Sequence, residues 1–110
     1  MDDQVVQPDL NLTTDRDGSR AVIGVAGELD AHSAPALDEE VARVVADGVS
    51  DVVLDLSGTS FLDSFGLRCL LSAQRSVADH GGRLSLRTPS KSVARLLDIA
   101  GLTEQFVVES

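Results

Sequence analysis

The sequence is poor in aromatic residues and almost free of cysteine. Its 110 residues include no Trp, no Tyr, and only three Phe. Hydrophobic residues make up 43% of the chain, so the core must consist mainly of Val, Leu, Ile and Ala. Such a core favours a small layered α/β domain over an aromatic-rich all-β barrel, and the length suits one domain. The single cysteine, Cys69, excludes an internal disulfide, which is typical of a reducing compartment.

Positive charge is also scarce. The chain has 9 basic and 18 acidic residues, which gives a net charge of −9. Proteins that bind nucleic acid or anionic membrane surfaces have the opposite excess, so the composition argues against both and favours partners with basic surfaces. No hydrophobic run is long enough for a membrane span, and the first residues do not resemble a secretory signal. We therefore expect a cytoplasmic protein. We also expect a monomer or weak dimer.

Short strand and helix patterns alternate along the chain. We expect residues 1–8 to form a flexible N-terminal tail and residues 9–110 to form one domain. Apolar periodicity predicts helices that begin near Ser33, near Asp63 or Ser64, and after Ser90. The strands between them are predicted near residues 10–12, 21–29, 51–56, 84–86 and 106–108. The resulting order, β-β-α-β-α-β-α-β, indicates an α/β fold with a small, mostly parallel, mixed sheet packed with helices.

Glycines mark the turns of this pattern. The segment DRDG at residues 15–18 predicts a hairpin turn, and Gly24 and Gly27 indicate a bulge or close packing within a strand. Gly48 and Gly81 are expected to end helices.

Two loops are expected to meet at one edge of the sheet. Residues 27–34 (GELDAHSA) follow one strand, and residues 57–67 (SGTSFLDSFGL) follow the central strand. In an open α/β sheet, binding sites lie beyond the carboxyl ends of the strands. A helical crossover between the loops places both on the same side. We therefore expect Asp30 and His32 to lie near Asp63 and Ser64.

Ser64 is the candidate switch residue at this edge. It falls in the first turn of a helix, where free N–H groups favour an anion, and Gly66 leaves the backbone open. A phosphoryl group there would add a charge of about −1.5 to −2, which the helix end tolerates but a partner surface facing Asp30 and Asp63 does not. The alternative is that Asp-Ser is an ordinary helix cap, and spacing alone favours that alternative.

A family resemblance favours the switch. Residues 52–71 (VVLDLSGTSFLDSFGLRCLL) resemble the signature segment of the STAS-domain anti-sigma factor antagonists, in which a phosphorylatable Ser follows Asp at a helix start. Residues 27–37 (GELDAHSAPAL) resemble the family's Gly-x-Leu-Asp turn, and residues 92–106 its closing helix and strand. The resemblance covers nearly the whole chain after residue 9, in the right order, and implies the STAS fold.

The resemblance also implies a partner-switching cycle. The unphosphorylated antagonist binds an anti-sigma factor that is also a serine kinase, and the sigma factor is released. The kinase then uses ATP to phosphorylate the antagonist, and a serine phosphatase resets the cycle. Carried onto this chain, Ser64 is the phosphoryl acceptor. No phosphate-binding loop is present, so no cofactor of its own is expected. The residues expected to contact the partner are Asp30, Asp63, Phe65, Gly66, Arg68 and Cys69.

Phe65 departs from the family pattern, which has a small polar residue after the Ser, and it is expected to alter partner choice. Helical projection places Phe65 and Cys69 together, away from the Leu face that includes Leu67 and Leu70. We expect this side of the helix to be an exposed docking face for a partner. The alternative is that Phe65 and Cys69 are scattered surface apolar residues without a binding role.

Two other functions remain as alternatives. The chain could be a STAS scaffold subunit of a stress-sensing complex or transporter, without phosphorylation. A hydrolase using Ser64 and His32 is disfavoured because no G-x-S-x-G elbow is present. The two His, one Cys and scattered carboxylates do not follow a metal-ligand spacing.

Overall fold

A mixed sheet with two helices on one face forms the framework of the protein. The computed structural model describes the backbone of residues 3–6 and all of residues 9–109. In chain order the elements are β1 (Asp3–Val6), β2 (Leu10–Asp17), β3 (Arg20–Leu29), α1 (Ala34–Ala46), β4 (Asp51–Asp55), β5 (Thr59–Leu62), α2 (Ser64–Asp79), β6 (Arg83–Arg87), α3 (Lys91–Ile99), a 3-10 turn η1 (Thr103–Gln105) and β7 (Val107–Glu109).

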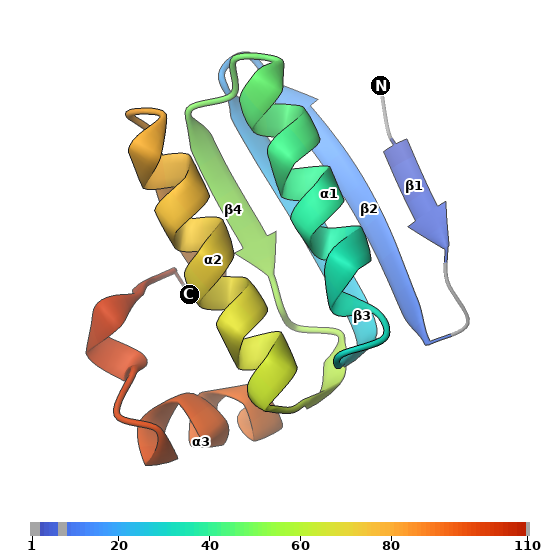
Figure 1. Cartoon of the computed structure of the whole chain (residues 1–110), viewed down its shortest axis with the longest axis vertical. Coiled ribbons are helices and arrows are strands. Elements are labelled where there is room, and N and C mark those ends of the chain that lie inside the picture. The colour runs from blue at the N-terminus through green and yellow to red at the C-terminus, as the bar shows by residue number, and fades with distance from the viewer. Residues whose placement is uncertain (1–2, 7–8, 110) are drawn as a thin grey trace.

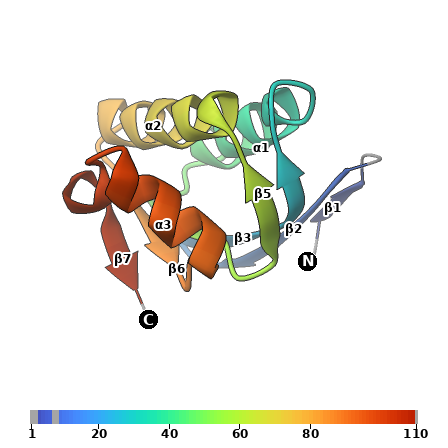
Figure 2. The ribbon, with the colours of Figure 1, turned by 90° about the horizontal axis from the view of Figure 1, so that it is seen from below.

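The sheet has the strand order β1-β2-β3-β4-β6-β7, and β5 attaches to β3. The pairs β1/β2 and β2/β3 are antiparallel, and the other four pairs are parallel. Helices α1 and α2 lie side by side on one face of this sheet (Figure 1). Helix α3 lies beside β5, near the ends of the parallel strands (Figure 2). The predicted mostly parallel, mixed α/β architecture is confirmed.

Aliphatic side chains fill the space between the sheet and the helices. Every second residue of β3, from Ala21 through Ile23 to Val25, is buried in this layer. The alternation follows from the pleat, which sends successive side chains to opposite faces. In β4, three consecutive residues, Val52, Val53 and Leu54, are fully buried. Both faces of this central strand are therefore covered.

The turn signals also match the structure. Asp17 pairs with Arg20 across a hairpin in which Gly18 has φ +63°. Gly48 (φ +92°) and Gly81 (φ +77°) follow the ends of α1 and α2 in the left-handed conformation that glycine adopts readily.

The prediction of a flexible tail is wrong for four of its residues. Asp3–Val6 form β1, which pairs antiparallel with the start of β2. The rest of the predicted tail, residues 1, 2, 7 and 8, lies outside the described residues. A strand here satisfies backbone groups along the edge of β2 that would otherwise be unpaired.

The loop predicted for residues 57–67 contains a strand, β5. Strand β3 pairs with β4 through Gly24 and then with β5 from Gly27 onwards. A bulge between Gly27 and Glu28 accompanies the change of partner, which confirms the bulge predicted there. Gly27 has φ +111°, and a Cβ atom on it would lie 2.2 Å from the Asp9 carbonyl oxygen. This exchange of partners brings β5, and therefore the start of α2, beside the end of β3.

Candidate functional site

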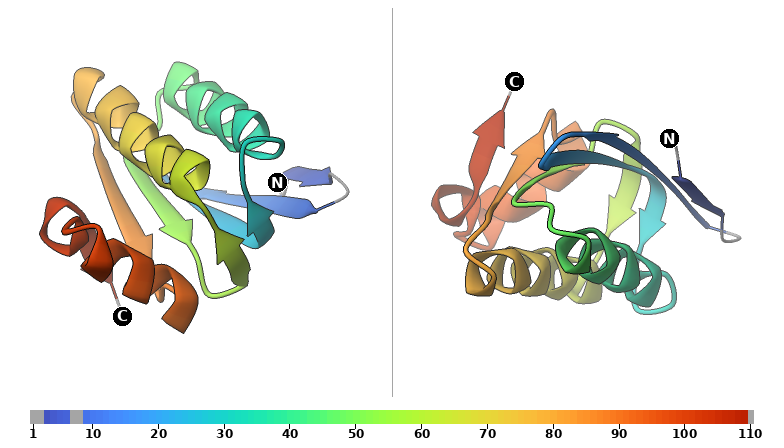
Figure 3. Two further views of the ribbon diagram at one scale, coloured as in Figure 1. Left: turned by 60° about the horizontal axis from the view of Figure 1, so that its bottom comes forward. Right: turned by 90° about the horizontal axis from the view of Figure 1, so that it is seen from above.

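The β3–α1 and β5–α2 loops lie side by side, as expected from the topology. Leu29 at the end of β3 is in parallel register with Leu62 at the end of β5. The next residue, Asp63, donates its backbone N–H to the Leu29 carbonyl oxygen at 3.4 Å. Figure 3 shows the ends of β3 and β5 running together toward the N-terminal ends of the two helices. The segments that carry Asp30 and Ser64 therefore share one edge of the molecule.

Hydrogen bonds within the β3–α1 loop hold Asp30 in place. Its Oδ1 accepts the backbone N–H groups of His32 and Ser33, each at 3.0 Å. These bonds, led by the one from Ser33, hold the pKa of Asp30 below its ordinary value. Ser33 itself is buried, and its hydroxyl donates to the Glu28 carbonyl at 2.7 Å. Ser33 occupies the predicted cap position of α1, but its side chain closes the loop and makes no cap bond to the helix.

Asp63 is the N-cap of α2. Its Oδ1 accepts the backbone N–H groups of Phe65 and Gly66, each at 3.0 Å. Ser64, the first residue of the helix, is exposed, and no described residue forms a hydrogen bond with its hydroxyl. The capping role that was the alternative to the switch therefore belongs to Asp63. Two N–H groups that were expected to be free for an anion are already occupied.

Gly66 is buried, so it does not offer the open backbone expected at the site. A Cβ atom at this position would lie 2.3 Å from the Leu29 carbonyl oxygen. Glycine thus lets the first turn of α2 approach the end of β3. Gly66 therefore packs just beneath the surface that is predicted to contact a partner.

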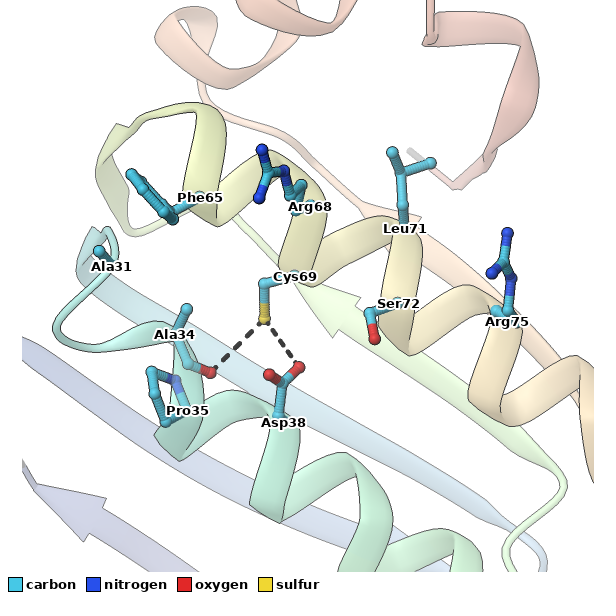
Figure 4. A pocket seen from close by; sticks show the side chains of 10 residues that line it. All are labelled: Ala31, Ala34, Pro35, Asp38, Phe65, Arg68, Cys69, Leu71, Ser72 and Arg75. Carbon is cyan, nitrogen blue, oxygen red and sulfur yellow. Dashed lines mark hydrogen bonds between the residues drawn. The ribbon is translucent and has the colours of Figure 1, made fainter.

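Cys69 is also buried, with 3% of its surface exposed, and the prediction of an exposed thiol is wrong. Its Sγ donates toward Asp38 Oδ1 at 3.2 Å and toward the Ala34 carbonyl at 3.6 Å (Figure 4). Burial, and then the neighbouring Asp38 carboxylate, raise the pKa of the Cys69 thiol far above its ordinary range. The thiol therefore stays protonated and unreactive near neutral pH.

The orientation of α2 explains why Cys69 is buried and not exposed as predicted. The side of the helix that is buried consists of Gly66, Cys69, Leu70, Ala73 and Val77. Three of these residues are small, which lets α2 pack closely beside α1. Leu67, which was placed on the Leu face with Leu70, is only partly buried at the flank of the helix, as is Leu71.

An open pocket of about 490 Å³ lies between the first turns of α1 and residues 65–75 of α2 (Figure 4). Phe65, 51% exposed, and Arg68 line it, and the Arg68 guanidinium lies over the Phe65 ring, 5.7 Å from the ring centroid. Asp38 and Arg75 also line the pocket and were not predicted. They come from different helices, so no short sequence pattern could have joined them.

The hydrolase alternative gains no support from the geometry. Among the described residues, the His32 imidazole forms no hydrogen bond with Ser64 or with the Asp30 carboxylate. No group of three or more His, Cys, Asp or Glu in residues 9–109 is placed to hold a metal ion. None of the described helices has the length and apolar character needed to cross a membrane.

Comparison with known proteins identifies the fold family. The STAS domain model matches residues 11–110, which is most of the chain. The chain belongs to the STAS domain family. This STAS domain is 32% identical over 95 residues to the anti-sigma-B factor antagonist of Bacillus subtilis, and the match covers 86% of each protein. The predicted family is confirmed.

Solved structures agree with this assignment. The STAS domain superposes on an anti-sigma factor antagonist from Mycobacterium paratuberculosis with a TM-score of 0.80 and 28% identity, covering 94% of this chain and 89% of that one. It also matches the anti-sigma factor antagonist SpoIIAA in its unphosphorylated form, with a TM-score of 0.76, 23% identity, and coverage of 90% and 88%. A phosphorylated form of SpoIIAA matches with a TM-score of 0.70, 22% identity, and coverage of 90% and 91%.

Proposed function

We propose that this STAS domain is a cytoplasmic anti-sigma factor antagonist whose binding is switched off by phosphorylation of Ser64. The unphosphorylated protein binds an anti-sigma factor that is also a serine kinase, and a serine phosphatase restores the binding form. The names of the relatives support the first part, since the Bacillus subtilis protein is an anti-sigma-B factor antagonist. The existence of SpoIIAA in unphosphorylated and phosphorylated forms supports the second.

The main support for the proposal is the accessibility of the Ser64 hydroxyl. It is exposed at the first position of α2 and has no hydrogen-bond partner among the described residues, while Asp63 alone supplies the cap. A kinase can therefore reach the hydroxyl without breaking an interaction of the fold. Local structure should survive the modification, because the cap does not depend on Ser64.

The chain supplies only the phosphoryl acceptor. The Ser64 Oγ attacks the γ-phosphorus of ATP held by the kinase, the new O–P bond forms, and the bond to the departing ADP breaks. The hydroxyl proton passes to a base of the kinase. The product carries about −1.5 to −2 of added charge beside the Asp63 carboxylate. A partner surface that accommodates one carboxylate there would face a concentrated negative charge after phosphorylation, which weakens binding.

The surface around Ser64 suggests the partner contacts. Asp63 and Asp30 are partly exposed, whereas Phe65 and Arg68 are exposed beside them. These four residues form the proposed contact surface. Gly66 and Cys69 support it from below, where they set the approach of α2 to β3 and α1.

A binding experiment with matched variants tests the switch. Purified Ser64→Ala and Ser64→Asp proteins would be titrated against the anti-sigma kinase of the source cell. We expect Ser64→Ala to bind like the wild type and Ser64→Asp to bind about 100-fold more weakly, because like charges in a contact cost several kcal/mol. Ser92→Asp, which adds the same charge in the exposed first turn of α3, is the control. Undiminished binding by folded Ser64→Asp would overturn the proposal.

Mass spectrometry tests the covalent step separately. After incubation with active kinase and ATP, the wild type should gain one phosphoryl group, and Ser64→Ala should gain none. An unmodified wild type would instead favour a STAS scaffold subunit that works without phosphorylation.

A further inference from the structure

Arg68 lies one helical turn after Ser64, on the same side of α2. Residues four apart on a helix have Cβ atoms about 5–6 Å from each other, so their side chains can meet. In the unphosphorylated protein the Arg68 guanidinium is occupied with a neighbour, since it lies over the exposed Phe65 ring at 5.7 Å. This contact holds both side chains at the rim of the α1–α2 pocket (Figure 4).

The first turn of α2 offers a phosphate at Ser64 few hydrogen-bond donors or cations. The N–H groups of Phe65 and Gly66, which could otherwise bind an anion, already donate to the Asp63 carboxylate. That carboxylate also repels the phosphate. Arg68 is a cation within one turn, whereas Arg75, which lines the same pocket, is eleven residues from Ser64 and about 16 Å away along the helix axis.

We propose that Arg68 is the intramolecular counter-ion of phosphorylated Ser64, and that phosphorylation draws it away from the Phe65 ring. An arginine–phosphate hydrogen bond is charge-assisted on both sides and is stronger than a cation–π contact at an exposed site. The move uncovers Phe65 and removes the guanidinium from its place at the pocket rim. Phosphorylation thereby changes the shape of the proposed contact surface as well as its charge. This inference rests on the proposed function for the source of the phosphate.

The test uses phosphoserine installed at position 64 during synthesis by genetic code expansion, so it does not depend on any kinase. Phosphorus NMR gives the pKa of the second phosphate ionisation. We expect Arg68→Gln to raise this pKa by about 0.3 unit relative to the wild type, because a nearby cation stabilises the dianion. Arg68→Lys should recover part of the shift, and Arg75→Gln should leave the value unchanged. The other ionisable residues of the two adjoining loops, Asp30, His32 and Asp63, are the same in all variants.

Proton NMR tests whether phosphorylation draws Arg68 away from the Phe65 ring. Cross-relaxation between the Phe65 ring and the Arg68 side chain should be present in the unphosphorylated protein and lost in the phosphoserine protein. A phosphate pKa that is the same in Arg68→Gln and wild type, or a Phe65–Arg68 contact that persists beside the phosphate, would overturn the inference. If the kinase leaves Ser64 unmodified, the proposed function fails, but these measurements still decide the role of Arg68.

Discussion

The Asp63 carboxylate accepts a hydrogen bond from the backbone N–H of Gly66, with its Oδ1 3.0 Å from the nitrogen. Together with the bond from the Phe65 N–H, this closes the first turn of α2 without the Ser64 side chain. The residue that caps the helix and the residue proposed for phosphorylation are thus neighbours with separate tasks. The separation lets the hydroxyl be modified while the helix start is preserved.

Stability measurements should distinguish these two tasks. Asp63→Ala should lower the free energy of unfolding by about 1 kcal/mol, because the backbone N–H groups of Phe65 and Gly66 lose their acceptor. Ser64→Ala should change it by less than about 0.5 kcal/mol, as expected of an exposed side chain without partners. Urea unfolding of both variants gives the comparison. An equal loss in the two proteins would mean that Ser64 contributes to the cap.

Gly66 should tolerate no side chain. A Cβ atom there would lie 2.3 Å from the Leu29 carbonyl oxygen and 3.0 Å from the Leu62 side chain, so the end of β3 or the helix must shift. We expect Gly66→Ala to cost about 2–3 kcal/mol despite the better helix propensity of Ala. Gly81→Ala is the control, since its Cβ atom meets nothing within 4 Å and only its φ of +77° is strained. Its expected cost is about 1 kcal/mol, and a cost equal to that of Gly66→Ala would contradict the close-approach argument.

The Cys69 thiol should resist alkylation in the folded protein. It is buried, it donates to Asp38, and its pKa is raised, so little thiolate is available. At pH 8 we expect iodoacetamide to modify native protein at least about 100-fold more slowly than protein unfolded in urea. The matched control is Ser72→Cys in a Cys69→Ala background, which puts an exposed thiol on the same helix. Native Cys69 reacting as fast as this control would refute the burial of the thiol.

Glu40 should make stability depend on pH. It is 4% exposed on α1 and accepts hydrogen bonds from Arg43 Nε at 3.0 Å and from the Thr14 hydroxyl of β2. The bond from Arg43, helped by the one from Thr14, lowers the pKa of Glu40 below its ordinary value of 4.5. Because the pKa of Glu40 is lower in the folded state than in the unfolded state, ionised Glu40 contributes fully to the free energy of unfolding at a pH above the unfolded-state pKa. This contribution is lost as the pH falls through the folded-state pKa.

Replacement of this carboxylate tests the effect. Glu40→Gln should lower the free energy of unfolding at pH 7 by about 1–3 kcal/mol, because hydrogen bonds to a charged group are lost. The difference from the wild type should shrink as pH falls below 4.5, because the unfolded wild-type chain takes up a proton at Glu40 there, whereas the folded protein does so only at a lower pH. Urea unfolding at pH 7, 5 and 3.5 measures this trend. A difference that stays constant across these values would show that ionised Glu40 does not contribute.

Local signals predicted most of the element boundaries. Gly48 and Gly81 follow helices as expected, and the Ser90 hydroxyl accepts the Val93 N–H at 3.4 Å as the predicted cap of α3. These features depend on residues within one or two turns of each other, so a short stretch of sequence contains the relevant interactions. The meeting of the two site loops was also predictable, because it follows from strand direction and crossover topology.

Other features depend on partners far away in the sequence. Strand β5 exists because β3 leaves β4 after Gly24 and offers new hydrogen bonds from Gly27 onwards, which no pattern within residues 59–62 reveals. Helix α2 carries apolar residues over more than half of its circumference, so periodicity alone could not decide which side faces inward. It lies between α1 and the C-terminal segment, where Gln74 Nε2 donates to the Gln105 carbonyl.

Caps, turns and strand patterns are short-range properties, so they were enough to predict the α/β class and the position of Ser64 at the start of a helix. The family was predicted from the resemblance of three sequence motifs. The tertiary structure was needed to show that Gly66 and Cys69 are buried while Phe65 and Arg68 on the same helix stay exposed. These outcomes depend on how closely α2 approaches β3 and α1. The small residues at that contact permit the approach, but the neighbouring elements set its direction.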